Sequence, residues 1–137
     1  IEVGAADALT TTATDAVGFS YDTAAATDVW FVVGVDSDVD AAGSGPVAAR
    51  FTKRTPVAGT NYSLSLVVNE NGEAEFYIDG ELVNRGSNIS GWKHDRLLDN
   101  AVSPDVNLCP TVILETRSAA AVTARVDYIY CSKGRNP

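Results

Sequence analysis

Apolar and polar positions alternate with a period of two over much of the chain, which is the pattern of half-buried β-strands. The clearest stretch is residues 61–83, where apolar residues stand at 64, 66 and 68 and again at 74, 76 and 78. Asn71-Gly72 lies between the two runs and predicts a hairpin, and Asp79-Gly80 predicts a second tight turn. Only a loop of odd length keeps both runs on one face, so we expect a loop of three or five residues, with Val68 opposite Phe76 and Leu66 opposite Ile78.

The continuous run Val29–Val35 indicates a second kind of strand, because it is β-branched and aromatic with no polar interruption. Such a run is typical of a central strand that is covered on both faces. It predicts a strand over 28–36, and Trp30 is expected in the core. Further strands are predicted over 17–21, 47–53, 110–117 and 122–131. Residues 36–46 and 84–108 are rich in turn formers and are predicted to be irregular.

The number of predicted strands, about eight to ten, and the near absence of helical periodicity predict an all-β fold. Strands at this short spacing are typical of an antiparallel β-sandwich or a barrel. A length of 137 residues fits a single domain. We expect residues 1–16 to form a loose N-terminal arm, residues 17–132 the sandwich, and residues 133–137 a C-terminal tail.

The formal net charge of −8 restricts the classes of partner. An acidic surface repels phosphate backbones and anionic lipids, so we expect neither a nucleic-acid nor a membrane partner. No stretch approaches the ~20 apolar residues that a membrane-spanning helix needs. A cationic partner or a calcium ion is easier to accommodate.

Two segments resemble a known family. One is Phe76–Val83, which carries the letters YIDG, and the other is Val112–Arg117 followed by Arg125–Tyr130, which carries VDYI. Together they resemble the concanavalin A-like lectin/glucanase jelly roll, a fold that laminin-G-like modules and many phage structural proteins share. The resemblance covers roughly residues 17–132 and implies a jelly-roll sandwich. Because this fold hosts lectins, glucanases, adhesion modules and virion proteins, it does not fix the function.

The Ala/Thr-rich strands, the short length and the lack of Met are most similar to accessory domains of phage virions. This resemblance implies a non-enzymatic capsid decoration (cement) protein, or a fibre or tail module, at the virion surface. Its partners would be other virion proteins such as a capsid lattice, and the chain would form a homo-oligomer or an array. The alternative is an extracellular carbohydrate-binding module, with or without the help of calcium, that binds a cell-surface glycan.

Candidate catalytic groups are few. Glycosidases of this fold use two carboxyls about 5–5.5 Å or about 6.5–9.5 Å apart, and Glu73 and Glu75 share one face of a predicted strand. The Glu-x-Asp-x-x-Glu pattern of laminarinase-type members is missing, however, so a solvated strand face is the favoured interpretation. His94 is the only histidine, and no Gly-x-Ser-x-Gly motif accompanies it. We therefore predict no catalytic residues.

The candidates for contact with a protein or a glycan are Trp92, Lys93 and Arg96, together with Tyr77. The first three lie in the predicted irregular region, and aromatic residues and Arg are enriched at protein interfaces. In the alternative interpretation, Trp92 caps the sandwich from a loop.

Asp36, Asp38 and Asp40 form an Asp-x-Asp-x-Asp segment whose carboxylates could converge on calcium, a cation that takes oxygen ligands. The EF-hand pattern is not met, because its sixth position is Ala41 and its twelfth is Val47. We therefore keep a polar loop at a sheet edge as the alternative to a calcium site.

The two cysteines, Cys109 and Cys131, are equidistant from residue 120. A hairpin folded about that residue would place them opposite each other on adjacent strands. A disulfide needs Cα atoms about 4.4–6.8 Å apart, which a cross-strand pair can meet. Both a disulfide and two free thiols fit this spacing.

Overall fold

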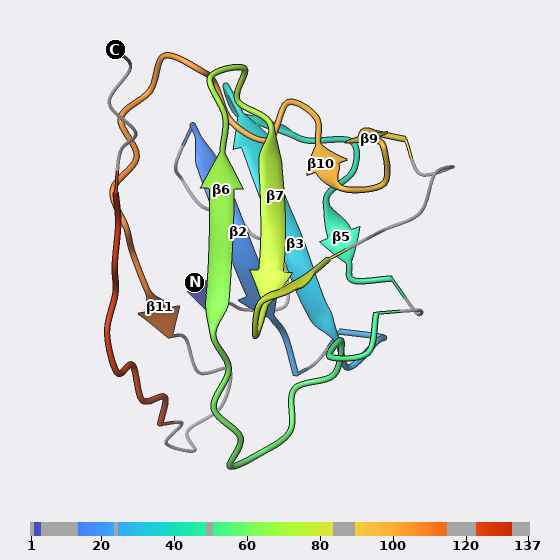
Figure 1. Ribbon diagram of the computed structural model, residues 1–137, viewed down its shortest axis with the longest axis vertical. Coiled ribbons are helices and arrows are strands. Elements are labelled where there is room, and N and C mark those ends of the chain that lie inside the picture. Colours follow the sequence, from blue (N-terminus) through green and yellow to red (C-terminus); the bar gives the residue numbers. More distant parts are fainter. Residues whose placement is uncertain are drawn as a thin grey trace.

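The computed structural model describes residues 2–3, 14–23, 25–48, 51–83, 90–114 and 123–132. These residues contain no helix, and their strands form two stacked sheets (Figure 1). The prediction of an all-β fold is confirmed, and the two layers are consistent with a β-sandwich. The finer jelly-roll connectivity stays a prediction. No helix long and apolar enough to cross a membrane occurs in the described ranges.

The first sheet is built around β2 (Ala16–Tyr21) and β3 (Trp30–Asp36), which pair antiparallel from Ala16 opposite Val35 to Tyr21 opposite Trp30. The short β1 pairs parallel with both of its neighbours, β2 and β11. Part of the predicted N-terminal arm therefore joins the sheet, whereas residues 4–13 lie outside the described residues. The strands of this sheet are β11 (Ile113–Leu114), β1 (Glu2–Val3), β2 (Ala16–Tyr21), β3 (Trp30–Asp36), β4 (Val39–Asp40) and β5 (Gly45–Pro46), the last of which pairs with β3.

The second sheet is built around β7, which pairs with three other strands. Its strands are β6 (Leu64–Val68), β7 (Ala74–Ile78), β8 (Glu81–Leu82), β10 (Leu97–Leu98) and β9 (Trp92–Lys93). The predicted turn at Asp79-Gly80 is confirmed, since Ile78 pairs with Glu81 and both turn residues have positive φ.

The β6–β7 hairpin confirms the predicted odd loop, because Val68 lies opposite Ala74 and five residues, 69–73, join the strands. The predicted partners were wrong by two residues, since Leu66 lies opposite Phe76. The side chain of Asn69 explains the difference. Its Oδ1 accepts the backbone N–H groups of Asn71 and Glu73, and this Asx turn closes the loop one pair earlier. A shift of two keeps every side chain on its predicted face.

The core lies between the two sheets. The inward faces of β2, β3 and β7 contribute Phe19, Val32, Phe76 and Ile78, all fully buried. Phe76 contacts Phe19 edge-to-face, with ring centroids 5.3 Å apart, and lies 6.3 Å from the ring of Trp92 in a tilted arrangement. Trp30 is also buried, as predicted.

Residues 36–53 differ from the prediction. A two-residue turn with positive φ at Ser37 and Asp38 joins β3 directly to β4, where a long loop was expected. Such a turn suits the right-handed twist of a hairpin, but it lacks the Asn-Gly signal that would reveal it. The strand predicted over 47–53 is replaced by β5, two residues earlier. Val47 and Phe51 are buried beyond it, and Ala49–Arg50 lie outside the described residues.

Part of the region predicted to be irregular is a small hairpin of β9 and β10, with Trp92 opposite Leu98. Both side chains are buried in the core. The Trp92 indole Nε1 donates to the carbonyl of Gly43 at 2.8 Å. A Cβ at Gly43 would collide with the indole ring, so the glycine allows this close approach. The hairpin thus ties one end of the second sheet to the β4–β5 loop.

The C-terminal part is the most exposed. Residues 123–132 have no assigned secondary structure, every one of them is exposed, and no strand of the described ranges pairs with them. In Figure 1 this red segment follows the left margin, beyond β6. The strand predicted over 110–117 is represented by β11, and its residues 115–117 lie outside the described residues. Residues 123–131 of the strand predicted over 122–131 are not assigned as a strand.

Candidate functional site

A polar surface covers the outer face of the second sheet. Along β7 the buried residues alternate with Glu75 and Tyr77, which are half-buried and therefore lie on the other side of the strand. Glu73 continues this row before the strand begins. The β9–β10 hairpin adds Lys93 and Arg96 to the same surface through direct contacts with the two glutamates. We call these five residues and their polar partners the outer polar face.

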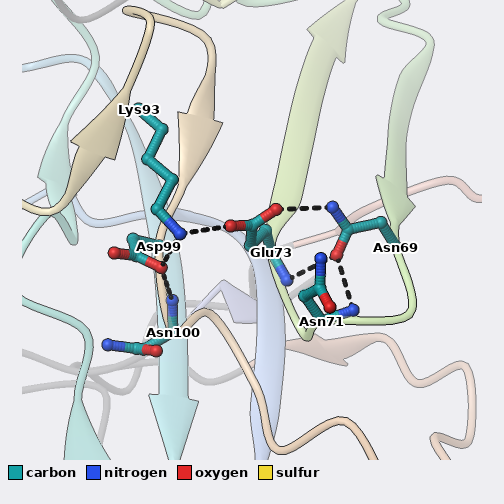
Figure 2. A network of polar contacts seen from close by, with 6 residues as sticks. All are labelled: Asn69, Asn71, Glu73, Lys93, Asp99 and Asn100. Carbon is teal, nitrogen blue, oxygen red and sulfur yellow. Dashed lines mark hydrogen bonds and ion pairs between the residues drawn. The ribbon is translucent and has the colours of Figure 1, made fainter.

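The first half of the outer polar face is centred on Glu73 (Figure 2). Its carboxylate pairs with the Lys93 ammonium and accepts the Asn69 side-chain amide at 2.6 Å. Lys93 also pairs with Asp99 at 2.9 Å. Only 11% of the Glu73 side chain is exposed, so its charge is balanced by partners rather than by water.

The second half is centred on Glu75. Tyr77 donates its hydroxyl to Oε2 of Glu75 at 2.6 Å. Both Nε and Nη2 of Arg96 donate to Oε1, with an Nε–Oε1 distance of 2.8 Å. All of these are charge-assisted hydrogen bonds, the stronger class in proteins. The arrangement holds Tyr77 and Arg96 in place on either side of one carboxylate.

The electrostatics of the two glutamates follow from these contacts. Hydrogen bonds from Lys93 and then Asn69 lower the pKa of Glu73, and the bond from Tyr77, followed by Arg96, lowers the pKa of Glu75. In return, Glu75 raises the pKa of the Tyr77 phenol. A general acid at neutral pH needs a raised carboxyl pKa. Both glutamates are shifted in the opposite direction, so they serve as fixed anions.

Three of the four predicted contact residues, Tyr77, Lys93 and Arg96, share the outer polar face. The fourth, Trp92, does not: it is buried on the opposite side of its short hairpin, which makes the predicted contact role wrong. Because successive residues of a strand face opposite sides, Trp92 and Lys93 cannot share a surface. The alternative interpretation, a tryptophan that caps the core, is the one observed.

Asn69 and Asp99 complete the network and were not predicted. An Asn two residues before an Asn-Gly pair is a detectable signal, since Asx turns place such a residue there. Asp99 had no comparable signal. Its contact with Lys93 depends on the β9–β10 hairpin, and that segment shows no period in the sequence.

Asp36, Asp38 and Asp40 do not form the predicted metal-binding set. No group of three or more His, Cys, Asp or Glu residues that could hold a metal ion occurs in the described ranges. Residues 37–38 form the tight turn between β3 and β4 in place of the predicted loop. Asp36 instead accepts the hydroxyl of Ser103 at 2.5 Å and that of Ser37 at 3.0 Å.

Ser103 also links the start of β2 to this turn. Its hydroxyl oxygen also lies 2.5 Å from Oδ1 of Asp15, so its one proton is shared between the two carboxylates, and Asp15 accepts the Ser103 backbone N–H at 3.2 Å. The side-chain bond from Ser103 is the main reason why the pKa of Asp15 is lowered. These contacts join three segments that are distant in the sequence, so Asp36 has a structural role here.

The remaining predicted candidates are not brought into a common site. Cys109 and Cys131 are free, exposed thiols, so the disulfide considered from their spacing is not formed in the structure. The hairpin about residue 120 that would align them falls on residues 115–122, which lie outside the described residues. His94 and Asp95 have φ of 52° and 65° and form the turn between β9 and β10.

The chain was compared with protein-family models, curated proteins and solved structures, and no match was found in any of the three.

Proposed function

We propose that this chain is a non-enzymatic structural domain that docks onto other proteins of a repeating assembly, as a decoration protein or a fibre or tail module does on a virion. The observation that carries the proposal is the exposed C-terminal segment. Tyr128 is 76% and Tyr130 80% exposed, and Val126 and Ile129 between and beside them are exposed as well. Contiguous apolar surface of this kind marks a site of association, and Tyr is enriched at protein interfaces.

The outer polar face supports the non-enzymatic part of the proposal. Its two glutamates are held as anions by Lys93, Tyr77 and Arg96. A glycosidase of the resembled fold needs one carboxyl that stays protonated near neutral pH to protonate the leaving group. The pKa shifts of this pair run against that role.

The mass of the native particle tests this proposal. Light scattering or direct imaging of purified native material is expected to find the chain in many copies in a large regular particle. A monomer at every accessible concentration, in the purified chain and in native extracts, would overturn the docking proposal.

A glycan-binding module is the second candidate, and the gathering of Tyr77, Lys93 and Arg96 on one sheet face favours it. Sugars are bound by planar side chains that stack on the sugar ring and by charged side chains that donate hydrogen bonds to its hydroxyls or accept hydrogen bonds from them. A glycan array, probed with and without calcium, tests the candidate directly. Tyr77→Ala should abolish a genuine signal at this face, whereas Tyr130→Ala, at an exposed tyrosine of the C-terminal segment, should leave it intact.

A further inference from the structure

We infer that copies of this chain join by strand addition, with residues 123–132 of one copy pairing along the open edge of β6 in a second copy. The inference rests on the proposed docking function and specifies the contact through which it occurs. Strand addition joins an extended segment to an exposed sheet edge, where backbone bonds give affinity and alternate side chains give register.

The donor is the C-terminal segment. It is exposed throughout and without a strand partner in the described ranges, and Figure 1 shows it drawn out along one margin of the molecule. Its sequence has the composition of a strand, with Val126, Tyr128 and Tyr130 at a spacing of two. A strand of this kind leaves its backbone donors and acceptors unpaired and its apolar face in water, and pairing with a sheet edge removes both costs.

The acceptor is the side of β6 away from β7, where no strand is paired in the part of the chain that the structure describes. The hydrogen bonds at the two ends of the hairpin fix which groups are free there. The N–H of Asp79 donates to Ser63 O, and the N–H of Asn69 donates to Glu73 O, so odd-numbered residues of β6 bond towards β7. In an antiparallel ladder the alternate residues face away. The open edge is therefore formed by the backbone groups of Leu64, Leu66 and Val68.

The same three residues show that the core is incomplete at this edge. Their side chains pack against the core but are only half-buried, whereas their partners on β7 are fully buried. Val17 and Tyr21 on β2 are likewise half-buried. An added strand with Val126, Tyr128 and Tyr130 facing inward would extend the apolar row and cover it.

The other face of the donor is compatible with the acceptor too. Arg125 and Asp127 would lie beside Ser65 and Val67, which carry no charge and are exposed on the outer side of β6. No like charges would oppose each other across the new pair. The period of two thus places apolar residues against apolar positions on the inward side, and Arg125, Asp127 and the apolar Ile129 beside uncharged positions on the outer side.

A second copy is the occupant because the segment does not cover β6 of its own chain. Had it done so, its inward side chains would be buried, yet Tyr128 and Tyr130 are among the most exposed apolar residues described. Each copy supplies one donor and one acceptor. Two copies can therefore exchange strands around a two-fold axis, or successive copies can continue as an array.

Complementation between two full-length variants tests the inference. In the donor variant, Tyr128→Asp with Tyr130→Asp places charges on the inward face of the segment. In the acceptor variant, Leu66→Pro removes an N–H that faces the open edge and leaves the bonds to β7 in place. Each variant alone should be monomeric by light scattering, and an equimolar mixture should form a particle with the mass of two chains. Val57→Asp, which adds a charge at an exposed valine outside both the C-terminal segment and β6, should assemble like the unmodified chain.

The outcomes separate the inference from the function on which it rests. An unmodified chain that assembles, together with variants that assemble equally well, would overturn strand addition and leave the docking function standing. An unmodified chain that stays monomeric would overturn both. Two monomeric variants whose mixture also stays monomeric would overturn the exchange between copies. If circular dichroism shows that Leu66→Pro disturbs the fold, Val67→Lys replaces it, since a lysine on an edge strand opposes pairing and the core leucine is kept.

Discussion

The edge strand β6 and the inner strand β7 of the second sheet differ sharply in burial, although apolar and polar residues alternate in both. On β7 the inward residues Ala74, Phe76 and Ile78 are fully buried, because strands flank β7 on both sides. On β6 the equivalent residues are half-buried, and the apolar residues of the C-terminal segment are exposed. Alternation identifies which face of a strand is apolar, but a strand becomes part of a core only when a neighbour covers its edge.

Phe76→Ala should have the largest effect on the free energy of unfolding, because it opens a cavity in the core beneath the inner strand β7. The ring is fully buried and contacts both Phe19 and Trp92. We expect a loss of about 3–5 kcal/mol, measured by chemical denaturation. Leu64→Ala, at a half-buried position on the edge strand β6, is the control and should lower the free energy of unfolding clearly less. Equal losses of unfolding free energy in the two variants would contradict the distinction between β7 and β6.

Gly72→Ala should come next. Gly72 has φ of 73°, and an added Cβ would collide with the carbonyl oxygen of Val102. The carbonyl of Gly72 also accepts the backbone N–H groups of Ala101 and Val102 at 3.0 and 3.1 Å. We expect a cost of about 3 kcal/mol, from left-handed strain and the collision together.

Gly59→Ala is the control that separates these two contributions. Its φ of 77° is nearly the same, but no atom lies within 4 Å of the added Cβ. The control should cost only about 1–2 kcal/mol, the strain alone. A cost as large as that of Gly72→Ala would mean that the contact with residue 102 contributes nothing.

The sequence predicted those parts of the fold whose signals are local. The strands around Phe19, Trp30 and Phe76, the odd loop of the β6–β7 hairpin and the turn at Asp79-Gly80 all follow from period and turn chemistry. The β9–β10 hairpin was missed because its strands have two residues each, too short for any period to show. What stabilises it is tertiary: Trp92 and Leu98 are buried in a core formed by distant segments.

The candidate site was predicted to the same extent. Tyr77 and the two glutamates could be placed on one face, since they belong to one strand pattern. Lys93 and Arg96 were named for their residue types, but their partners could not be named. Those contacts arise from the pairing of β10 with β7, and a sequence without local signals does not specify such a pairing.

Acidification should destabilise the chain at the outer polar face, and by less than Phe76→Ala or Gly72→Ala does. The pKa values of Glu73 and Glu75 are lowered in the folded chain, so their stabilisation is fully present above the glutamate pKa of the unfolded chain, about 4.3. It is lost as the pH falls through the lower pKa values of the folded chain. We therefore expect the denaturant concentration at the unfolding midpoint to decrease when the pH is lowered below about 4. Glu73→Gln should flatten this dependence, whereas Glu70→Gln, at an exposed loop position, should preserve it.

Tyr130→Ser should change the free energy of unfolding least. It tests most directly the contrast between the covered strand β7 and the exposed C-terminal segment. In a dilute, monomeric sample the side chain is 80% exposed, so the free energy of unfolding should change by no more than about 0.5 kcal/mol. At concentrations where copies associate, the same substitution should lower the apparent stability, because association stabilises the folded chain by mass action. Denaturation curves at two protein concentrations check both expectations. A large loss in the dilute sample would mean that Tyr130 is buried within its own chain, which would remove the donor strand from the surface.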